Sequence, residues 1–336
     1  MPPRAAASSV SRIAALRPSR VLPGARLAIE GGPFPFDGVG LPPVRVGGVA
    51  ARVVFASPDR LVAIVPDGAA GRATVRVDGV PGETPLVDVG EPVASGFHQV
   101  DNPLVDAQGR VYVTCSGSRG QQTAVSVYRV RPDGVRELFA SGITNATALA
   151  FDPEGRLHVS SRFDGSVSRV GPDGTVDVVH TDLGVACGLA FAPDGTLFVG
   201  DRAGTVFRIG PDGVATPFAS LPPSMAAFHV ALSSDGHVFV TAPTLSPCDP
   251  VYRVSPSGQV DRLGVTFGRP QGLAFDVHGH LHVVEALAGA SGVYRLAPEG
   301  PPELVVAGPG LVGLAFGPDG TLFVTSNDTL WRFPTP

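Results

Sequence analysis

The chain has 336 residues, enough for two domains, and a formal net charge of −5 at pH 7. All 25 basic residues are arginine, so lysine chemistry such as Schiff-base catalysis or a P-loop phosphate site is excluded. An acidic chain without lysine also argues against a nucleic-acid partner. The 43 glycines and 34 prolines fall at turns between apolar runs, which favours a folded chain over a disordered one.

The beginning of the chain and its cysteines carry little functional information. Residues 1–10 are expected to be a loose leader, and the segment around them lacks the apolar core of a signal peptide. No apolar run is long enough to span a membrane. Cys115, Cys187 and Cys248 have no paired spacing, so neither a disulfide framework nor a zinc site is indicated. These features predict a cytoplasmic protein without a membrane partner.

Residues 11–89 contain short alternating runs broken by Pro-Gly, Gly-Gly and Asp-Gly, which predict a small β-sandwich. Turn and apolar residues also occur along this region in the order and spacing of a known domain family. The pattern resembles the IPT/TIG family of immunoglobulin-like domains. This resemblance implies a spacer or interaction module, so a protein contact is expected here and no chemistry. The matching positions are Leu16, Pro18, Pro23, Gly24, Leu27, Ile29, Gly31, Phe34, Val46, Gly48, Ala50, Leu61, Val65 and Pro66.

Six copies of one pattern of three strands occupy residues 90–336. In the clearest copy, residues 186–213, an apolar strand is followed by a Pro-Asp-Gly turn and by two alternating strands. A period near 40 residues made of short strands predicts a β-propeller with one blade per repeat. The expected fold is therefore all-β, with a six-bladed propeller after an immunoglobulin-like sandwich. The turn glycines, 40 to 46 residues apart, are Gly109, Gly155, Gly195, Gly236, Gly279 and Gly320.

The two ends of the propeller region predict how the ring closes. The later blades end in a fourth strand with the sequences ELFASG and TPFASL, and the segment EPVASG at 91–96 matches them. That segment precedes the first repeat, whereas the last repeat stops after its third strand at 329–333. We expect residues 91–96 to pair with residues 329–333, because this leaves no open blade edge.

The candidate site is expected on the face that carries the variable loops, because such loops on a rigid scaffold usually bind ligands. Two positions in each blade should point toward the centre of this face, one before the first strand and one at the end of the second, and the residue after the first of these positions is compared with them. Most of their occupants are small or apolar. The polar occupants are Asp101, Asn102, Asp201, His229, Gln271 and Glu285, and Asn145 and Arg269 lie in adjoining links.

Carboxylates around an axis suit a hard cation, so Asp101, Asp201 and Glu285 are predicted to bind Ca²⁺ or Mg²⁺. His229 is the candidate for proton transfer, because the unperturbed pKa of histidine lies near neutrality. Two alternatives stay open: Asp201 caps its own turn, and Glu285 is a solvated loop residue. The residues predicted to bind substrate are Asn102, Asn145, Arg162, Arg202, Arg269 and Gln271.

Arg162 and Arg202 share one loop position in adjacent repeats, and with Arg119 and Arg269 they suggest an anion-binding group. Solvated charge on the rim is the alternative. Cys187 is expected to be a small buried thiol. Other residues recur once per blade or replace recurring aromatics, and these are expected to belong to the scaffold. They are Arg129, Arg169, Arg208, Arg253, Arg295 and Arg332, with His158 and His282.

The repeat GLAF-x-PDG-x-LFV…VFRIGPDG resembles the NHL and SMP-30/gluconolactonase-like propellers, over about 245 residues. The resemblance implies a divalent cation held by residues of the first position in several blades, and Asp101 matches the acidic member of that set. Thr147, Cys187 and Phe228 stand where the other members are expected. The leading hypothesis is accordingly a metal-assisted hydrolase of a small lactone or ester, with the cation polarising the carbonyl and lowering the pKa of a bound water.

The chain also resembles streptogramin lyases, in which two histidines and a glutamate of neighbouring blades surround Mg²⁺. Gln271 and Glu285 match two of these positions, and His229 lies in the preceding blade, one residue out of register. The resemblance implies an elimination that opens an ester, with His229 as base. A third hypothesis is a non-catalytic NHL-type propeller that binds a small molecule.

Overall fold

The structure, a computed structural model, describes residues 11–35, 40–287, 289–297 and 299–333. The leader expected at residues 1–10 lies outside them. The described residues form β-strands and turns, and none of them forms a helix long and apolar enough to cross a membrane. The chain divides into two compact units. The all-β fold expected from the sequence is confirmed.

The first unit comprises Met1–Glu91 and Leu304–Pro309. Its strands follow the order β1-β3-β6-β5-β4-β7-β8-β2; they are antiparallel from β1 to β8, and β2 runs parallel to β8. Alternate side chains such as Leu27 and Ile29 are fully buried in an apolar core. The strands are β1 (Arg12–Arg17), β2 (Arg20–Val21), β3 (Arg26–Gly32), β4 (Val44–Val46), β5 (Val49–Ala56), β6 (Arg60–Ile64), β7 (Gly71–Val77), β8 (Leu86–Val89) and β29 (Glu303–Ala307), whose Ala307 pairs with Val21.

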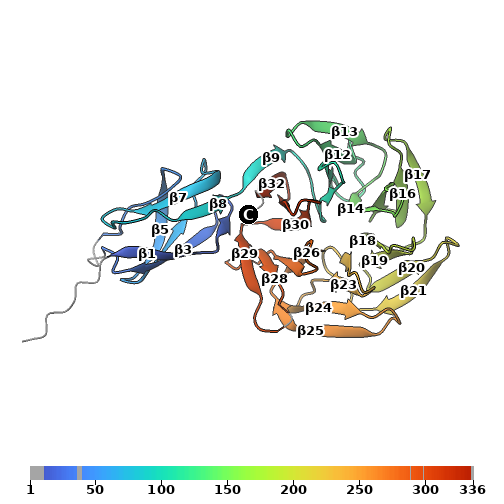
Figure 1. The fold of residues 1–336 in the computed structure, drawn as a ribbon. Helices are drawn as coiled ribbons and strands as arrows, with labels where there is room; N and C mark the ends of the chain where they lie inside the picture. Colours follow the sequence, from blue (N-terminus) through green and yellow to red (C-terminus); the bar gives the residue numbers. More distant parts are fainter. Residues whose placement is uncertain (1–10, 36–39, 288, 298, 334–336) are drawn as a thin grey trace, which may run out of the picture. The chain divides into compact units, whose positions relative to one another are not determined.

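The second unit, Pro92–Glu303 with Gly310–Pro336, is a β-propeller. Five separate sheets of four strands have the orders β10-β11-β12-β13, β14-β15-β16-β17, β18-β19-β20-β21, β22-β23-β24-β25 and β30-β31-β32-β9. The strands β26, β27 and β28 pair in the same antiparallel manner in the fifth repeat. In Figure 1, β14, β18, β26 and β30 surround the centre of this unit, whereas β13, β17, β21 and β25 lie at its periphery.

The strands of the propeller unit are short and follow one another with brief turns. The chain therefore returns to the centre once in every repeat. Their bounds are β9 (Glu91–Ser95), β10 (Leu104–Val105), β11 (Val111–Thr114), β12 (Val127–Val130), β13 (Arg136–Ala140), β14 (Ala146–Phe151), β15 (Leu157–Ser161), β16 (Ser166–Val170), β17 (Val176–His180), β18 (Ala186–Phe191), β19 (Leu197–Asp201), β20 (Thr205–Ile209), β21 (Ala215–Ser220), β22 (His229–Leu232), β23 (Val238–Thr241), β24 (Asp249–Val254), β25 (Val260–Phe267), β26 (Pro270–Phe275), β27 (Leu281–Glu285), β28 (Gly292–Arg295), β30 (Leu311–Phe316), β31 (Leu322–Ser326) and β32 (Thr329–Phe333).

The repeated D-x-x-G pattern forms the turn between the first two strands of a sheet. In the first repeat, Asp106 Oδ1 accepts hydrogen bonds from the amides of Gln108 and Arg110, both at 2.9 Å. The turn glycines of all six repeats have φ between 74° and 86°, a conformation that favours glycine. The motif recurs because each blade needs this turn, and the motif therefore belongs to the scaffold.

Apolar side chains fill the space between neighbouring sheets. One cluster joins Ala148 and Val167 of the second repeat to Leu189, Leu197 and Val199 of the third, and the last three are at most 5% exposed. Close packing of this kind holds the first strand of each sheet in a fixed position around the centre. The residues before and within these first strands consequently lie close to one another around the centre.

Candidate functional site

A buried contact joins two residues that lie 128 positions apart in the sequence, His229 at the start of β22 and Asp101 before β10. His229 Nδ1 lies 2.8 Å from Asp101 Oδ1, and the two residues are 0% and 3% exposed. Because a carboxylate only accepts, Nδ1 carries the shared proton, and Nε2 of a neutral ring is left without one. Within the described residues, His229 Nε2 and Asp101 Oδ2 have no hydrogen-bond partner. Such buried, unpaired atoms lower stability, which makes the pair a candidate for ligand contact.

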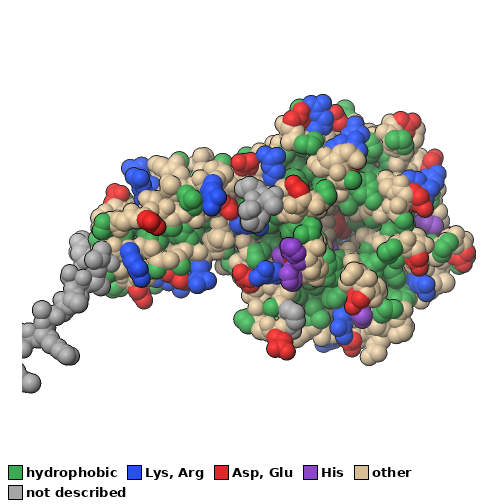
Figure 2. Space-filling model, in the orientation of Figure 1, with side chains coloured by type: hydrophobic (Ala, Val, Ile, Leu, Met, Phe, Trp, Pro, Cys, Tyr) green, Lys and Arg blue, Asp and Glu red, His purple; other side chains and the backbone are tan. Residues whose placement is uncertain are grey.

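Two glycines lie against the backbone segments that carry this pair, at the centre of the propeller unit, which Figure 2 shows as a hollow on one face. A Cβ atom at Gly313 would lie 2.6 Å from the carbonyl oxygen of Asp101, and one at Gly188 would lie 2.6 Å from the carbonyl oxygen of Phe228. Neither glycine has a positive φ, so close approach is the reason that glycine is required. Both stand at the repeat position that His229 occupies in its own blade. Glycine at this position lets the backbone of the neighbouring blade pass close by, next to the pair.

Asn102, predicted to bind substrate, uses its amide to hold the scaffold together. Its Nδ2 donates to the carbonyl oxygen of Leu273 at 2.9 Å, and its Oδ1 accepts from the amide of Leu314 at 3.1 Å. These contacts join the segment before β10 to β26 and β30. The side chain therefore fixes the position of the neighbouring Asp101.

Two other amides lie near the centre, and the sequence pointed to only one of them. Gln271, predicted to bind substrate, is 8% exposed, and its Nε2 has no partner among the described residues, so it keeps a donor available. Gln99 is fully buried; its Nε2 donates to the carbonyl oxygen of Asp101 at 2.5 Å, and its Oε1 accepts from the amide of Thr114 at 2.8 Å. Gln99 precedes the first repeat, so repeat comparison gave no signal for it.

Asp201 and Glu285 use their carboxylates to close backbone loops. Asp201 Oδ1 accepts from the amides of Val185 and Ala203, at 2.8 and 3.0 Å. Glu285 accepts from three amides, those of Gly268 at 2.5 Å, Arg269 at 2.9 Å and Leu287 at 2.6 Å. The turn-capping alternative for Asp201 agrees with these contacts, and Glu285, 3% exposed, is not a solvated loop residue.

The residues at the centre do not fit the predicted Ca²⁺ or Mg²⁺ site. Among the described residues, no three His, Cys, Asp or Glu side chains form a group that could hold a metal ion, so Asp101, Asp201 and Glu285 are not gathered around one point. Asp101 Oδ2 is the one carboxylate oxygen of the three residues found buried without a partner. A cation of this class needs about six oxygen ligands. We therefore derive no chemical step through a metal.

Asn145, another predicted substrate-binding residue, organises the loop after β11. It is fully buried and has a φ of 50°, which asparagine tolerates better than most residues. Its Oδ1 accepts from the amide of Gly120 at 2.7 Å, and its Nδ2 donates to the carbonyl oxygens of Ser116 at 2.5 Å and Ser118 at 2.8 Å. Its amide is fully used inside the protein.

Arg162 and Arg202 follow β15 and β19 directly, and both are half-buried. Within the described chain, neither guanidinium group forms a hydrogen bond or an ion pair. Burial lowers the pKa of Arg162, and repulsion from Arg202 adds to the effect. Cys187 lies near both, and burial together with the negative charge of Asp101 raises the pKa of its thiol to about 12. This thiol is protonated at neutral pH, in agreement with the expected buried, unreactive cysteine.

The other two arginines of the suggested anion-binding group are different. Arg119 and Arg269 are exposed, and the backbone of Arg269 is held by the loop-closing carboxylate of Glu285. Their exposure favours the solvated-rim alternative for both, because hydrated charges interact weakly with small anions.

Residues expected to belong to the scaffold have local partners. His158 Nε2 lies 3.0 Å from Asp152 Oδ2, and its ring packs edge-to-face on Phe191 at 4.8 Å between centroids. His282 packs on Phe316 at 4.9 Å in the same manner. Several of the recurring arginines pair across two strands with an acid eight positions later. These pairs are Arg129–Glu137, Arg169–Asp177, Arg253–Asp261 and Arg295–Glu303.

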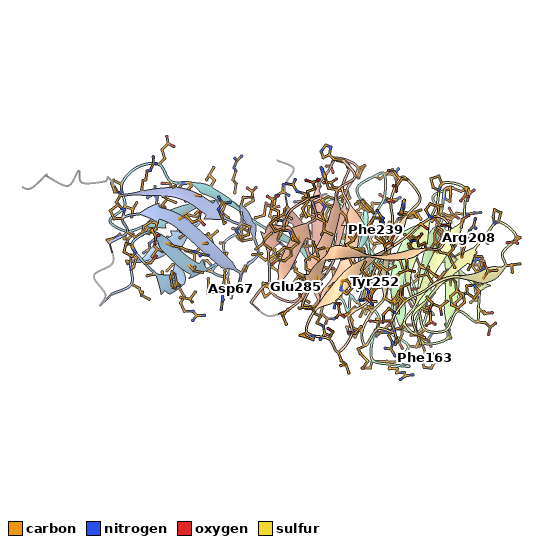
Figure 3. The ribbon with its side chains drawn as sticks, turned by 90° about the horizontal axis from the view of Figure 1, so that it is seen from below. Asp67, Phe163, Arg208, Phe239, Tyr252 and Glu285 are labelled. Atoms are coloured by element: carbon orange, nitrogen blue, oxygen red, sulfur yellow. The ribbon has the colours of Figure 1, made fainter. Side chains whose placement is uncertain are left out.

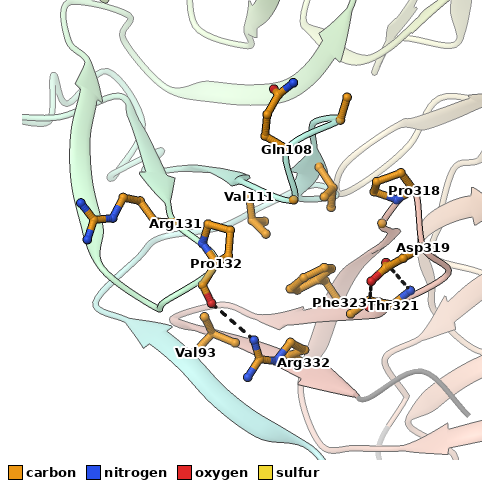
Figure 4. A pocket seen from close by; sticks show the side chains of 14 residues that line it. Val93, Gln108, Val111, Arg131, Pro132, Pro318, Asp319, Thr321, Phe323 and Arg332 are labelled. Atoms are coloured by element: carbon orange, nitrogen blue, oxygen red, sulfur yellow. Dashed lines mark hydrogen bonds between the residues drawn. The ribbon is translucent and has the colours of Figure 1, made fainter.

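Grooves between neighbouring sheets offer another possible ligand site. One of them has a volume of about 350 Å³ and is lined by Val93, Pro132, Phe323 and Arg332, among others (Figure 4). Arg332 Nη1 donates to the carbonyl oxygen of Pro132 at 3.5 Å across it. Equivalent positions of other repeats line two more grooves of about 480 and 610 Å³. Because they repeat with the blades, these grooves are features of the scaffold.

No protein-family model and no curated protein matches this chain. Among solved structures, the chain is similar to a gluconolactonase of Xanthomonas campestris, with 20% identity, 73% of this chain and 89% of that chain covered, and a TM-score of 0.61. It is also similar to an auxiliary nutrient binding protein of Bacteroides ovatus, with 14% identity, coverage of 95% and 96%, and a TM-score of 0.56. A streptogramin B lyase shares 14% identity, with coverage of 79% and 87% and a TM-score of 0.54. At these identities the similarities establish the propeller fold.

Proposed function

We propose that the propeller unit hydrolyses a small lactone or ester by acid–base catalysis. The resemblance to SMP-30/gluconolactonase-like proteins implies hydrolysis of such substrates with the help of a metal, and the proposal keeps the reaction but not the metal. The observation that carries the proposal is the buried His229–Asp101 pair with its unpaired Nε2. A histidine oriented by a carboxylate through Nδ1 presents Nε2 as a proton acceptor. The similarity to a gluconolactonase in fold is consistent with this class of reaction.

The proposed reaction needs only the residues of the central pair. His229 Nε2 takes a proton from a water molecule as the water oxygen attacks the ester carbonyl carbon. Asp101 stabilises the imidazolium ion that forms. The tetrahedral intermediate then breaks its bond to the alkoxide oxygen, and the imidazolium returns the proton to that oxygen. The product of a lactone is a hydroxy acid, and the histidine ends in its starting state.

Contact with a ligand requires a local rearrangement, because His229 is fully buried. The side chains able to move are those without internal partners, namely Gln271 and the half-buried Arg162 and Arg202. By contrast, the amides of Asn102 and Asn145 are held by backbone groups on both sides. We propose that the first group contacts the ligand and that the second keeps its surroundings rigid.

The test compares hydrolysis of glucono-δ-lactone and γ-butyrolactone by the wild-type protein, His229→Gln and His158→Gln. We expect His229→Gln to lower turnover about 10²- to 10⁴-fold, the usual loss on removing an acid–base group, and His158→Gln to keep wild-type turnover. Product analysis separates hydrolysis, which gives a hydroxy acid, from elimination by a streptogramin-lyase-like route, which gives an unsaturated product. Equal activity of the two variants, with both folded, would exclude His229 as the base.

A non-catalytic binding propeller is the second candidate. The complete burial of His229 favours it, as does the similarity of an auxiliary nutrient binding protein over 95% of this chain. In that case the wild-type protein would bind a small molecule at the centre but release no product from any lactone or ester.

The finer features of the fold belong to the same proposal. We propose six blades, with β26, β27 and β28 as part of the fifth, because they pair in the order of the other repeats. The position of β9 beside β32 supports closure of the ring by residues 91–96 and 329–333. The antiparallel strands and single core of residues 11–89 support an IPT/TIG-like sandwich that contacts another protein.

A further inference from the structure

We infer that the half-buried guanidinium groups of Arg162 and Arg202 form an anion subsite beside the His229–Asp101 pair, and that the substrate carries a carboxylate in addition to its scissile ester. The inference deepens the proposed function and rests on it. Asp101 and His229 supply acid–base chemistry to any ester, whereas a carboxylate subsite would select one class of substrate.

Contacts between neighbouring sheets connect the strands that precede both arginines to the segment that carries His229. Ser160, two residues before Arg162, donates from Oγ to the carbonyl oxygen of Cys187 at 2.6 Å. The next residue, Gly188, donates its amide to the carbonyl oxygen of Phe228 at 2.7 Å. Phe228 directly precedes His229. Hydrogen bonds therefore connect β15, which ends next to Arg162, through β18 to the start of β22, where the histidine lies.

The Arg202 loop approaches the same point from the next sheet. Gly200, two residues before Arg202, is so close to Phe228 that an added Cβ atom would lie 2.4 Å from its ring. The amide of Arg202 donates to the carbonyl oxygen of Val185 at 3.1 Å, and its carbonyl oxygen accepts from the amide of Ser224 at 2.9 Å. The backbone on both sides of this arginine is thus fixed near the centre.

The charges of this pair are uncompensated. Several other half-buried arginines in the propeller unit have acidic partners, as Arg129 has Glu137 at 2.8 Å, whereas no such partner of Arg162 or Arg202 occurs in the described residues. Two like charges in partly buried positions repel each other, and a bound anion would relieve the repulsion. Arginine binds carboxylates through two parallel hydrogen bonds, which gives geometric selectivity as well as energy.

The experiment uses a ligand that cannot be hydrolysed, so that binding is measured apart from catalysis. 3-Oxocyclopentane-1-carboxylate has the ring carbonyl of a five-membered lactone together with a carboxylate, and cyclopentanone is its neutral match. Isothermal titration calorimetry should show that wild-type protein binds the carboxylate more tightly than the ketone. The double variant R162Q/R202Q should lose about 10- to 100-fold in affinity for the carboxylate, the usual loss for hydrogen bonds to a charged group.

Arg208→Gln is the matched control. Arg208 is exposed, and in the edge-on view of Figure 3 it lies toward the face opposite to Phe163, the neighbour of Arg162 in sequence. This variant should bind the carboxylate as the wild-type protein does. If R162Q/R202Q does not fold, R162K/R202K replaces it; it keeps both charges, loses the paired hydrogen bonds and should bind more weakly than wild type.

The inference would be overturned by equal affinity of wild-type protein and R162Q/R202Q for the carboxylate, or by equal affinity of wild-type protein for carboxylate and ketone. An equal loss in Arg208→Gln would also overturn it, because the effect would then come from net charge. Failure of the proposed hydrolase is seen separately, as wild-type turnover by His229→Gln. The two claims therefore fail in different assays.

Discussion

Two buried histidine–aspartate pairs in the propeller unit have different surroundings. In the pair His158–Asp152 the partners are six residues apart, and Asp152 also accepts the amide of Arg156 at 2.9 Å and its Nε at 2.6 Å. In the pair His229–Asp101 the partners are 128 residues apart, and one carboxylate oxygen is left without a partner. Each histidine has one ring nitrogen without a described partner, but only Asp101 has an unsatisfied oxygen.

This difference in hydrogen bonding distinguishes a pair that belongs to the scaffold from a pair in the candidate site. Although burial acts to raise it, hydrogen bonds from Arg156 and His158 hold the pKa of Asp152 below its ordinary value. The same turn contacts recur at Asp106 and Asp276 in other blades. A local pair whose carboxylate oxygens are both bonded, and whose turn contacts recur in other blades, stabilises the fold. A long-range pair with an unbonded carboxylate oxygen is better placed to meet a ligand.

The largest expected effect comes from replacing each of the two aspartates by asparagine, in separate variants. Asp101→Asn can offer an amide N–H to His229 Nδ1 and so move the ring proton to Nε2, which would lower turnover about 10²- to 10⁴-fold. Asp152→Asn should keep wild-type turnover at temperatures where it is folded. A pH–rate profile measured on both variants distinguishes lost proton transfer from lost folding. Similar turnover of both would remove the distinction between the pairs.

The two variants should rank in the opposite order by stability: Asp152→Asn should lose more free energy of unfolding than Asp101→Asn. Asp152→Asn weakens several hydrogen bonds to a buried charge and should lower the free energy of unfolding by about 2–3 kcal/mol. Asp101→Asn should cost less, because one oxygen of Asp101 has no partner to lose. The contribution of Asp152 is present above its unfolded pKa of about 3.9 and is lost as the pH falls through the lower folded value. Urea unfolding at pH 7 and at pH 3 measures both effects.

The packing of the centre is tested by two glycine substitutions. Gly188→Ala places a Cβ atom 2.6 Å from a backbone oxygen and should destabilise the protein by about 1–3 kcal/mol. Gly264 in β25 has no atom within 4 Å of an added Cβ and no positive φ, so Gly264→Ala should be neutral or slightly stabilising. Thermal unfolding of the two variants is the measurement. A neutral Gly188→Ala would show that the first strands are not tightly packed around the pair.

The smallest expected effect at pH 7 is that of the scaffold histidines, which becomes visible as a change in the pH dependence of stability. Burial lowers the pKa of His158, outweighing Asp152, and it also lowers the pKa of His282. Because the unfolded chain then binds more protons, stability should fall as the pH drops below about 6.5, by up to about 1.4 kcal/mol per pH unit for each histidine. H158Q/H282Q should show a shallower slope between pH 7 and pH 5. An unchanged slope would mean that other groups dominate.

The propeller could be predicted from the sequence because its signal is repeated. Each repeat contains a turn glycine, an apolar first strand and an aromatic residue or a histidine in its place. Comparison of the repeats therefore distinguishes residues common to all blades, which belong to the scaffold, from residues that occur in one blade. His229 was identified in this way, as a large ring at a position otherwise small.

What each exception contacts could not be predicted, because the contacts cross between blades. Asp201, Glu285, Asn102 and Asn145 are polar in the right positions, yet their side chains are used by backbone groups of adjacent loops and strands. Gln99, which holds Asp101, lies outside the repeat. Hydrogen-bond partners depend on how blades close around a centre, and no period in the sequence encodes that arrangement.

The most direct test of the central claim is the ¹⁵N spectrum of the histidine rings, with His229 assigned by comparison with His229→Gln. The account predicts that His229 has its proton on Nδ1, bound to Asp101, and that its Nε2 resonance shifts when 3-oxocyclopentane-1-carboxylate is added, while the resonances of His158 stay in place. An unshifted His229 at a saturating concentration of the bound carboxylate would contradict the account, because the pair would then be part of the scaffold.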